Sequence, residues 1–413
     1  MISYPDSVQY LYSLGNEIKT AKLGLERIRE LMAALGNPER WFRSIHVAGT
    51  NGKGSTCAMI ESSLRAAGRR TGLYTSPHLL SPTERIRING RDAEEREFAE
   101  AFQHVHTVAL RTLDEHPTYF ETVTAMAFHM FRERGVELAV VEVGLGGRLD
   151  ATNVVMPELC VITPVDFDHE AWLGSNLSAI AGEKAGILKR GVPAVVATQR
   201  PEAYARIREV ASEVGAPLVG PDEPNHVDVH VYGCRFALAD LRIECPLAGE
   251  HQVENAVTAV RALRVLGLHR DAIERGVRST SWPGRLERVG TRPEMILDGA
   301  HNPAGVRALA AYIRRFFSDR RVWLVYGAMR DKSIEEIGDL LAPVAHQVIL
   351  TAPDSPRALR PDALAPLFDH PRIRTAANLA SALELAREAA PEDVVFITGS
   401  LYLVGEARRL LVQ

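Results

Sequence analysis

The sequence has little lysine. Lysine and arginine together number 48, but only six of these residues are lysine. The two side chains are nearly interchangeable on a solvated surface, whereas a site that needs a compact or neutralisable amine accepts only lysine. We therefore expect about half of the lysines to have a specific function and the others to be chance survivors. The six are Lys19, Lys22, Lys53, Lys184, Lys189 and Lys332.

Several other features are missing, and each absence excludes a class of protein. The four cysteines form no CxxC pair, which favours a reduced, cytoplasmic protein over a disulfide-bonded or zinc-binding one. No apolar run approaches the ~20 residues that span a bilayer, and the first residues hold acids and a proline in place of a signal peptide's apolar core. The net charge of −4 gives no general attraction to nucleic acid or anionic membrane. We expect a cytoplasmic monomer with neither of these partners.

What the chain does have is a regular alternation of short apolar runs and amphipathic helical patterns, which indicates βαβ units and mostly parallel sheets. We expect an α/β fold with two domains. Residues 1–288 form a P-loop-type ATPase domain with a mostly parallel sheet, and residues 289–413 form a smaller Rossmann-like α/β domain. The predicted strands are 45–48, 72–75, 138–143, 159–163, 192–197, 295–297, 322–326, 348–351 and 394–398.

A glycine-rich segment lies between the first strand and a helical pattern. Glycines let backbone amides close around phosphate oxygens, the following helix contributes its positive end, and Lys53 supplies a charge for the β- and γ-phosphates. The segment departs from the strict Walker pattern, because Val47 replaces the first glycine and Gly54 follows the lysine. A glycine turn without a ligand is the alternative. The flanking strand and helix favour phosphate binding by Thr50, Asn51, Gly52, Lys53, Gly54 and Ser55.

Polar residues follow other strands, where ligands gather in open α/β sheets. Glu142 lies in an apolar strand, where a carboxylate is costly unless it is paired or binds metal. His169 follows Asp168 beyond the next strand, and the Ser76 hydroxyl also follows a strand. Taken singly, His169 is more commonly a satisfied structural group and Ser76 part of a proline turn. Beside a phosphate loop, the three are candidate Mg²⁺ ligands.

Three further segments give weaker signals. Residues 118–121 combine an aromatic pair and an acid at the start of a helical pattern, which fits either a ligand site or a helix N-cap with core aromatics. Asp298 and His301 directly follow a strand, and Arg285 lies in a turn-rich linker. Asn255 lies on the polar side of a helix. Linker turns usually carry exposed arginines, and asparagine is common near helix starts.

Together these segments resemble the folylpolyglutamate synthase/dihydrofolate synthase family, a branch of the Mur-type ligases. The matches occur in order from about residue 20 to residue 405, and EVGLGGRLDATN and TSPHL are far more specific than the phosphate loop. The matching stretches are LGLER at 23–27, the loop at 49–56, TSPHL at 75–79, ERI at 84–86, TYFE at 118–121, EVGLGGRLDATN at 142–153, Asp168 with His169, WLG at 172–174, EKAGI at 183–187, PGR at 283–285, DGAHNP at 298–303, Asp331 with Lys332, and GSLY at 399–402.

The resemblance implies a role for each matching residue. Gly52, Lys53, Gly54 and Ser55 would hold the ATP phosphates. Ser76, Glu142 and His169 would bind Mg²⁺, with two ions expected. His301 would lie near the transferring phosphate or the incoming glutamate. Lys184 matches a position that family members carry as a carbamate. Further ATP contacts would come from Asn255, Arg285 and Asp298, and the pteridine site would be lined by Thr118, Tyr119, Phe120, Glu121, Leu149, Asp150 and Ala151.

The chain departs from the family pattern at a few positions. Asp166 adds a carboxylate near the metal site, Glu170 follows the histidine, and Gly182 replaces a frequent arginine. Lys22 stands where some bifunctional members carry an acid. These departures bear on the number of metal-site acids and on the details of the pteridine site.

The implied activity is ATP-dependent ligation of L-glutamate to folates, and also to 7,8-dihydropteroate, through an acyl phosphate. Two alternatives stay open. A cell-wall Mur-type peptide ligase shares the architecture but not TYFE or TSPHL. A P-loop kinase or nucleotide switch shares the phosphate loop but does not explain a second α/β domain with DGAHNP. A non-catalytic nucleotide-binding module fits least well, because Lys53, Glu142 and His169 are all present.

Overall fold

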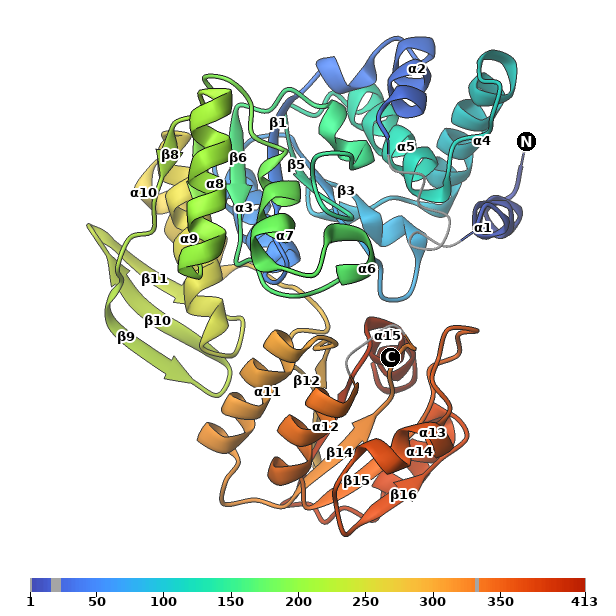
Figure 1. Ribbon diagram of the computed structural model, residues 1–413, viewed down its shortest axis with the longest axis vertical. Helices are drawn as coiled ribbons and strands as arrows, with labels where there is room; N and C mark the ends of the chain where they lie inside the picture. Colours follow the sequence, from blue (N-terminus) through green and yellow to red (C-terminus); the bar gives the residue numbers. More distant parts are fainter. Residues whose placement is uncertain (1, 16–23, 331–333, 413) are drawn as a thin grey trace. The chain divides into compact units, whose positions relative to one another are not determined.

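A computed structural model describes residues 2–15, 24–330 and 334–412. The chain forms two compact units (Figure 1). The first contains Met1–Asn225, Ala237–Ile243 and Glu254–Thr280, and the second contains His226–Phe236, Glu244–Val253 and Ser281–Gln413. The boundary expected near residue 288 stays a prediction. No helix in the described part of the chain is both long enough and apolar enough to cross a bilayer.

The first unit is built on an eight-stranded sheet with the order β4-β3-β2-β5-β1-β6-β7-β8. The strands from β2 to β8 in this order run parallel, and β3 and β4 form an antiparallel edge. The strands are β1 (Arg43–Ala48), β2 (Thr71–Tyr74), β3 (Ile86–Ile88), β4 (Arg91–Asp92), β5 (Leu138–Glu142), β6 (Leu159–Ile162), β7 (Ala194–Val196) and β8 (Leu218–Val219).

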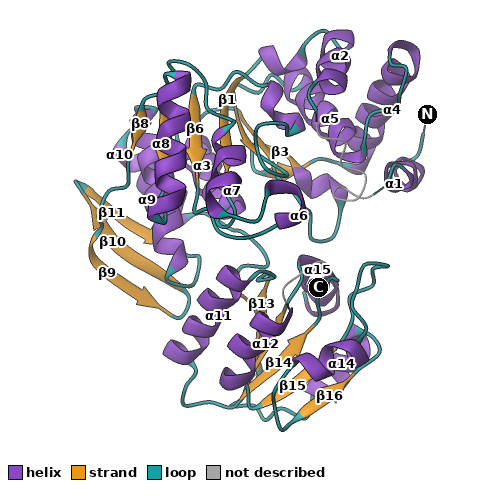
Figure 2. Cartoon of the chain, viewed as in Figure 1, coloured by secondary structure: helices purple, strands orange, loops and turns teal. Residues whose placement is uncertain are grey.

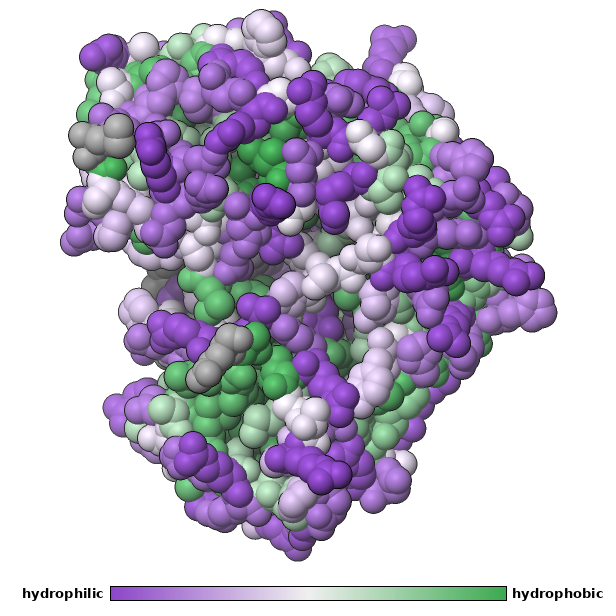
Figure 3. Space-filling model, turned by 180° about the vertical axis from the view of Figure 1, so that it is seen from behind, coloured by the Kyte–Doolittle hydropathy of each residue, from purple (hydrophilic) through white to green (hydrophobic). Residues whose placement is uncertain are grey.

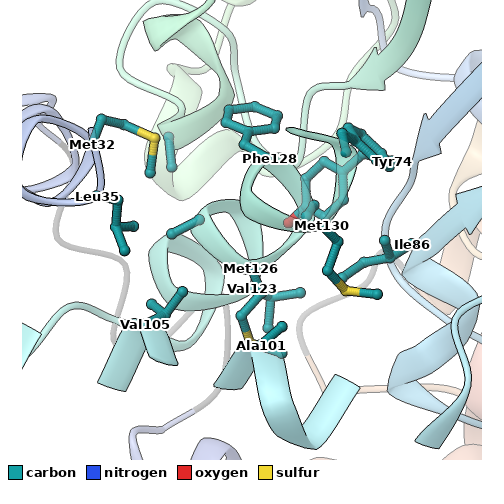
Figure 4. Close-up of a cluster of buried hydrophobic side chains, with 14 of the residues drawn as sticks. Met32, Leu35, Tyr74, Ile86, Ala101, Val105, Val123, Met126, Phe128 and Met130 are labelled. Carbon is teal, nitrogen blue, oxygen red and sulfur yellow. The ribbon is translucent and has the colours of Figure 1, made fainter. Parts of the chain in front are cut away.

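Helices pack against this sheet and bury its apolar side chains. The α-helices of this part of the chain are α1 (Tyr4–Ser13), α2 (Glu26–Ala34), α3 (Lys53–Ala66), α4 (Glu95–Thr112), α5 (Tyr119–Glu133), α6 (Glu170–Leu173), α7 (Leu177–Ala185), α8 (Pro201–Val214), α9 (His251–Val265) and α10 (Arg270–Arg278). Figure 4 shows one buried cluster, to which α2 contributes Met32, the C-cap of α2 contributes Leu35, α5 contributes Phe128, and β2 contributes Tyr74. This core holds α5 in place, and α5 begins at the predicted pteridine segment.

The second unit contains a six-stranded sheet with the order β12-β13-β17-β14-β15-β16, in which β12 alone is antiparallel to its neighbour. Helices flank the strands (Figure 2). The strands are β12 (Glu287–Thr291), β13 (Glu294–Asp298), β14 (Val322–Tyr326), β15 (Gln347–Leu350), β16 (Ile373–Thr375) and β17 (Val394–Thr398). The helices are α11 (Pro303–Phe316), α12 (Ile334–Leu341), α13 (Pro361–Leu364), α14 (Leu379–Ala386) and α15 (Leu401–Leu411).

The structure confirms the predicted α/β fold with mostly parallel sheets. Each predicted strand is present with bounds within two residues of those expected, and 322–326 and 394–398 match β14 and β17 fully. A separate three-stranded sheet was not predicted, and it consists of β9 (Asn225–His230), β10 (Gly233–Leu238) and β11 (Leu241–Cys245). All four cysteines are free and buried, as expected of a reduced protein. Hydrophilic side chains spread over much of the face in Figure 3.

Candidate functional site

The first unit brings four predicted site segments to one edge of its sheet. Strands β2, β5, β1 and β6 are neighbours in that order and run parallel, so their carboxyl ends lie at the same edge. Ser76 follows β2, Glu142 ends β5, the glycine-rich loop follows β1, and His169 lies in the segment after β6. Ligands of open α/β sheets bind beyond such an edge.

The loop between β1 and α3 needs glycine at two positions. Gly49 has a φ of 149° and Gly52 a φ of 81°, in a region that other residues rarely adopt. A Cβ atom on Gly49 would overlap the Thr163 hydroxyl, and one on Gly52 would overlap the Asn255 side chain. Asn255, a predicted ATP contact, therefore lies directly against the loop.

The loop's backbone amides divide into two groups. The amides of Thr50 and Asn51 donate to the Pro164 carbonyl at 2.9 and 3.3 Å, which ties the loop to the segment after β6. Helix α3 then begins at Lys53, and the first amides of a helix point out of its N-terminal end, which carries a partial positive charge. This helix start can receive an anion such as a phosphate.

Two lysines converge on the loop. The Lys53 amine donates to the Gly49 and Thr50 carbonyls, both at 3.2 Å, and the Lys184 amine donates to the same Gly49 carbonyl at 2.8 Å. Lys184 lies on α7 and is buried. Burial, with a smaller contribution from the Lys53 charge, lowers the pKa of Lys184 to about 7 against the opposing effect of Asp168 and Asp150. Lys184 is thus poised to exist partly as a neutral amine at physiological pH.

The remaining lysines differ in their surroundings. Lys189 is partly buried, and its amine donates to the Asn153 carboxamide oxygen at 2.7 Å. Lys19, Lys22 and Lys332 lie outside the described residues. Each lysine that the structure describes therefore contacts the phosphate loop or the DATN segment.

Two of the predicted metal ligands, Ser76 and Glu142, lie together. The Ser76 amide donates to a Glu142 carboxylate oxygen at 3.2 Å, and Glu142 is only 4% exposed. His169 is the N-cap residue of α6, with its Nε2 atom 3.9 Å from Asp168. Within residues 2–15, 24–330 and 334–412, no three His, Cys, Asp or Glu side chains are grouped closely enough to hold a metal ion. The full ligand set of Ser76, Glu142 and His169 stays a prediction.

One additional acid near the predicted metal site has a partner of its own. Asp166 forms an ion pair with Arg200 at 3.5 Å. The Thr50 hydroxyl also donates to the Asp166 backbone carbonyl, at 2.9 Å. The additional carboxylate of Asp166 is thus paired with the positive charge of Arg200.

Segment 118–121 forms a helix cap. The Thr118 side chain accepts from the Glu121 amide, and the Glu121 carboxylate accepts from the Thr118 amide and hydroxyl, both at 2.8 Å, and from Arg27 at 2.8 Å. Tyr119 is buried, while Phe120 is partly exposed and packs so closely on Gly144 that a Cβ atom there would overlap its ring. Thr118 and Glu121 thus form the helix N-cap that was one of the two interpretations of this segment. A contact of the segment with a pteridine stays a prediction.

Segment 149–151 lies next to this cap. Asp150 caps the 3-10 helix η3 (Ala151–Val154) and is buried, and η3 contacts α5. Burial raises the pKa of Asp150, and its hydrogen bonds oppose that rise. The structure therefore brings together the two segments predicted to line the pteridine site. A buried histidine beneath them, His46, belongs to none of the motifs recognised in the sequence.

The second unit gathers three predicted residues around Gly299. Asp298 ends β13 and accepts from the Leu286 and Ala300 amides, both at 3.0 Å. A Cβ atom on Gly299 would overlap the Arg285 guanidinium, and His301 Nδ1 lies 2.8 Å from the Gly299 carbonyl oxygen. Burial raises the pKa of Asp298, and the charge of Arg285 counteracts this most.

Comparisons with known proteins give a consistent result. Residues 47–263 match the Mur ligase middle domain, and residues 284–401 match the Mur ligase glutamate ligase domain. The chain is 36% identical to the Bacillus subtilis dihydrofolate synthase/folylpolyglutamate synthase, over 94% of this chain and 95% of that protein. It is 38% identical over 98% of its length to a Haloferax volcanii probable bifunctional folylpolyglutamate synthase/dihydropteroate synthase, of which it spans only half.

Solved structures agree with these matches. Mycobacterium tuberculosis folylpolyglutamate synthase complexed with ADP is similar, with a TM-score of 0.93, 36% identity and coverage of 100% of this chain and 99% of that one. A bifunctional folylpolyglutamate synthase/dihydrofolate synthase from Yersinia pestis, complexed with AMPPNP and a Mn ion, gives a TM-score of 0.86 and 32% identity, with 98% of each chain covered.

Proposed function

The chain belongs to the folylpolyglutamate synthase/dihydrofolate synthase family of Mur ligases, and from this premise we propose that it joins L-glutamate by an amide bond to folates and to 7,8-dihydropteroate. It is an ATP-dependent ligase. The observation that carries the proposal is the convergence of Lys53 and buried Lys184 on the phosphate loop, at the edge where Glu142 ends its strand. We further propose that it acts as a cytoplasmic monomer on these small molecules.

The reaction needs ATP because a carboxylate is a poor acylating agent. The substrate carboxylate attacks the γ-phosphorus of ATP, which gives an acyl phosphate and ADP. The amine of glutamate then attacks the acyl carbon, and inorganic phosphate leaves. Lys53, whose amine lies against the phosphate loop, would offset the negative charge that builds up during phosphoryl transfer. His301, near the carboxyl end of β13, is proposed to lie near the transferring phosphate or the incoming glutamate.

ATP is proposed to contact both units. Thr50, Asn51, Gly52, Gly54 and Ser55 surround its phosphates, together with Lys53, and Asn255 lies against the same loop. Arg285 and Asp298 belong to the second unit, and we propose that the two units close on the nucleotide during the reaction. Closure would exclude water, which otherwise hydrolyses an acyl phosphate.

A divalent metal ion accompanies the nucleotide, and we propose Mg²⁺, with two ions in the active complex. The residues that would hold it are Ser76, Glu142 and His169. The buried carboxylate of Glu142 suits a hard cation that prefers oxygen ligands. When bound, the ion offsets charge on the phosphates.

The function is tested by offering ATP, Mg²⁺ and labelled glutamate with dihydropteroate and with tetrahydrofolate in separate reactions. Label is expected in a product with each acceptor. Incorporation with one acceptor alone restricts the activity to that substrate. No incorporation with either, in the presence of ATP hydrolysis, contradicts the proposal and favours a kinase or a nucleotide switch.

Replacing Glu142 by glutamine should severely weaken the binding of Mg²⁺, because a neutral amide is a poor ligand for a hard cation. We expect the Mg²⁺ concentration for half-maximal activity to rise about tenfold or more. Glu158→Gln is a matched control, since Glu158 precedes β6 at the other end of the strand and pairs with Arg43. A Glu142→Gln enzyme with the wild-type Mg²⁺ titration would show that this acid is only structural.

Replacing Arg285 by methionine should raise the KM for ATP about tenfold, the size of one lost charge-assisted hydrogen bond. The same variant should show less nucleotide-induced compaction in small-angle scattering. Arg288→Met is the control, because Arg288 is engaged by Glu294 at 3.3 Å and by the Tyr232 ring. An equal KM for ATP in the two variants would show that Arg285 does not contact the nucleotide.

A further inference from the structure

A chain of buried polar side chains runs beneath the segment that carries Asp150. His46 lies within β1, where it is fully buried between Val141 of β5 and Cys160 of β6. Its Nε2 atom is 2.8 Å from the hydroxyl oxygen of Thr152, 106 residues away in the chain. The Thr152 hydroxyl donates to Asp150 Oδ1 at 2.5 Å.

The direction of each hydrogen bond between His46, Thr152 and Asp150 follows from the donors around the Asp150 carboxylate. Asp150 Oδ2 accepts from the Gly144 and Leu145 amides at 3.1 and 2.8 Å, and Oδ1 accepts from the Thr152 amide at 3.0 Å as well as from its hydroxyl. The three backbone amides stabilise the ionised form of this side chain, and an ionised carboxylate can only accept hydrogen bonds. The Thr152 hydroxyl must then give its proton to Asp150. Its oxygen accepts from His46, which is therefore protonated on Nε2.

The state of His46 agrees with this assignment. Burial lowers the pKa of His46 to about 3, and the Lys189 charge lowers it further, so the imidazole is neutral at physiological pH. Among the residues that the structure describes, its Nδ1 atom is buried without a hydrogen-bond partner. A buried polar atom without a partner costs free energy, so an apolar side chain would serve better if His46 only filled space.

The carboxylate at the end of the chain holds both segments of the proposed pteridine site. Through the Gly144 and Leu145 amides, Asp150 fixes the loop that follows β5. Gly144 packs on the ring of Phe120, so the position of that loop also limits the position of the ring. Asp150 also caps η3, which starts at Ala151. A shift of the Asp150 carboxylate would therefore disturb the packing of the loop against Phe120.

We propose that His46 is a positioning residue for the pteridine-bearing substrate, which it affects through Thr152 and Asp150 without touching it. The Nε2 proton of His46 orients the Thr152 hydroxyl, the hydroxyl orients the Asp150 carboxylate, and the carboxylate sets the loop against Phe120. This inference rests on the proposed function, since it takes these segments to line the folate site.

The test compares variants that keep or remove the donor. His46→Leu and Thr152→Val remove the relay, whereas His46→Gln carries an amide nitrogen near the Nε2 position. We expect the first two to raise the KM for the pteridine substrate about tenfold, the size of one hydrogen bond in a charged network, with the KM for ATP unchanged. His46→Gln should keep the KM for the pteridine substrate close to that of the wild type. The KM of the double variant, His46→Leu with Thr152→Val, should be no higher than that of either single variant. Ser44→Ala, on the same strand, is the control and should match the wild type.

A spectroscopic readout accompanies the kinetics. Nitrogen NMR of the wild-type enzyme labelled at histidine should show His46 protonated on Nε2 and unprotonated on Nδ1 from pH 6 to 9. An Nδ1-protonated ring would overturn the proposal. So would a His46→Leu enzyme that binds ADP normally and has the wild-type KM for the pteridine substrate, or a His46→Gln enzyme as impaired as His46→Leu. A wild-type enzyme inactive with both folate acceptors would instead overturn the proposed function, and this inference with it.

Discussion

Replacement of Lys53 by alanine should lower ligase turnover by about 100- to 1000-fold, the range seen when one preorganised charge or donor is removed from a developing negative charge. In the structure the Lys53 amine lies over the loop, where it donates to the Gly49 and Thr50 carbonyls. The side chain is half-buried at the start of α3 and not part of the core. Its removal should leave the thermal unfolding midpoint close to that of the wild type.

Arg65→Ala provides the matched control for Lys53. Arg65 lies near the other end of α3, where it forms an ion pair with Glu61 at 3.3 Å. Its loss should change turnover little, since Arg65 lies about three helical turns from the phosphate loop. If the Lys53→Ala enzyme kept the wild-type ATP affinity and turnover, the phosphate-loop assignment would be wrong. The experiment also perturbs Lys184, because the charge of Lys53 is one cause of its lowered pKa.

Lys184 is proposed to carry a carbamate formed from CO₂, and its loss should have an effect of similar size to that of Lys53. Only a neutral amine captures CO₂, and arginine, always charged, does not. Burial lowers the pKa of Lys184 to about 7, which supplies neutral amine near that pH. Asp168 and Asp150 act in the opposite direction but do not outweigh burial and Lys53. A carbamate would add an anion beside the phosphate loop, able to orient a metal ion.

The sign of the pH effect follows from the same pKa. The neutral fraction of Lys184 rises as the pH increases through about 7, so carbamate occupancy should fall as the pH drops below that value. The alternative is an ammonium that stays bound to the Gly49 carbonyl, to an acid or to phosphate directly. In that alternative the modified fraction is zero at every pH, so a modified fraction that rises with pH through about 7 distinguishes the carbamate from the bare ammonium.

Chemical rescue distinguishes these states. Lys184→Ala should reduce turnover about 100-fold or more and regain part of it when acetate or formate is supplied as a carbamate substitute. Lys184→Arg should stay inactive under that treatment, because its guanidinium fills the space and keeps its charge. A high-resolution map from crystals grown with bicarbonate that shows a bare amine, together with no rescue, would rule the carbamate out.

The strands that position the site could be predicted because each is a continuous buried apolar run. β5 and β6 are buried at every residue, as a central parallel strand requires. β9 could not be found in this way, since four of its six residues are exposed and its burial does not alternate. The edge strand β4 has only two residues, both exposed, which is too short for any periodic signal.

The site was predictable where its chemistry is local in the sequence. The glycines and Lys53 of the phosphate loop lie together in the chain, and the scarcity of lysine alone predicts a specific function for Lys184, which is buried. Segment 118–121 has the spacing of a capping box, and the sequence could not separate that role from ligand binding. The contact of His46 with Thr152 joins residues 106 positions apart and leaves no local pattern. Only the order of β5, β1 and β6 places them together.

We propose that ATP activates the substrate carboxylate as an acyl phosphate before glutamate attacks it. The most direct measurement uses a folate or dihydropteroate acceptor whose carboxylate carries oxygen-18, with ATP, Mg²⁺ and L-glutamate. We expect each turnover to transfer one labelled oxygen from the carboxylate to inorganic phosphate, with ADP as the other product. Phosphate free of label, or AMP and pyrophosphate as products, would contradict it.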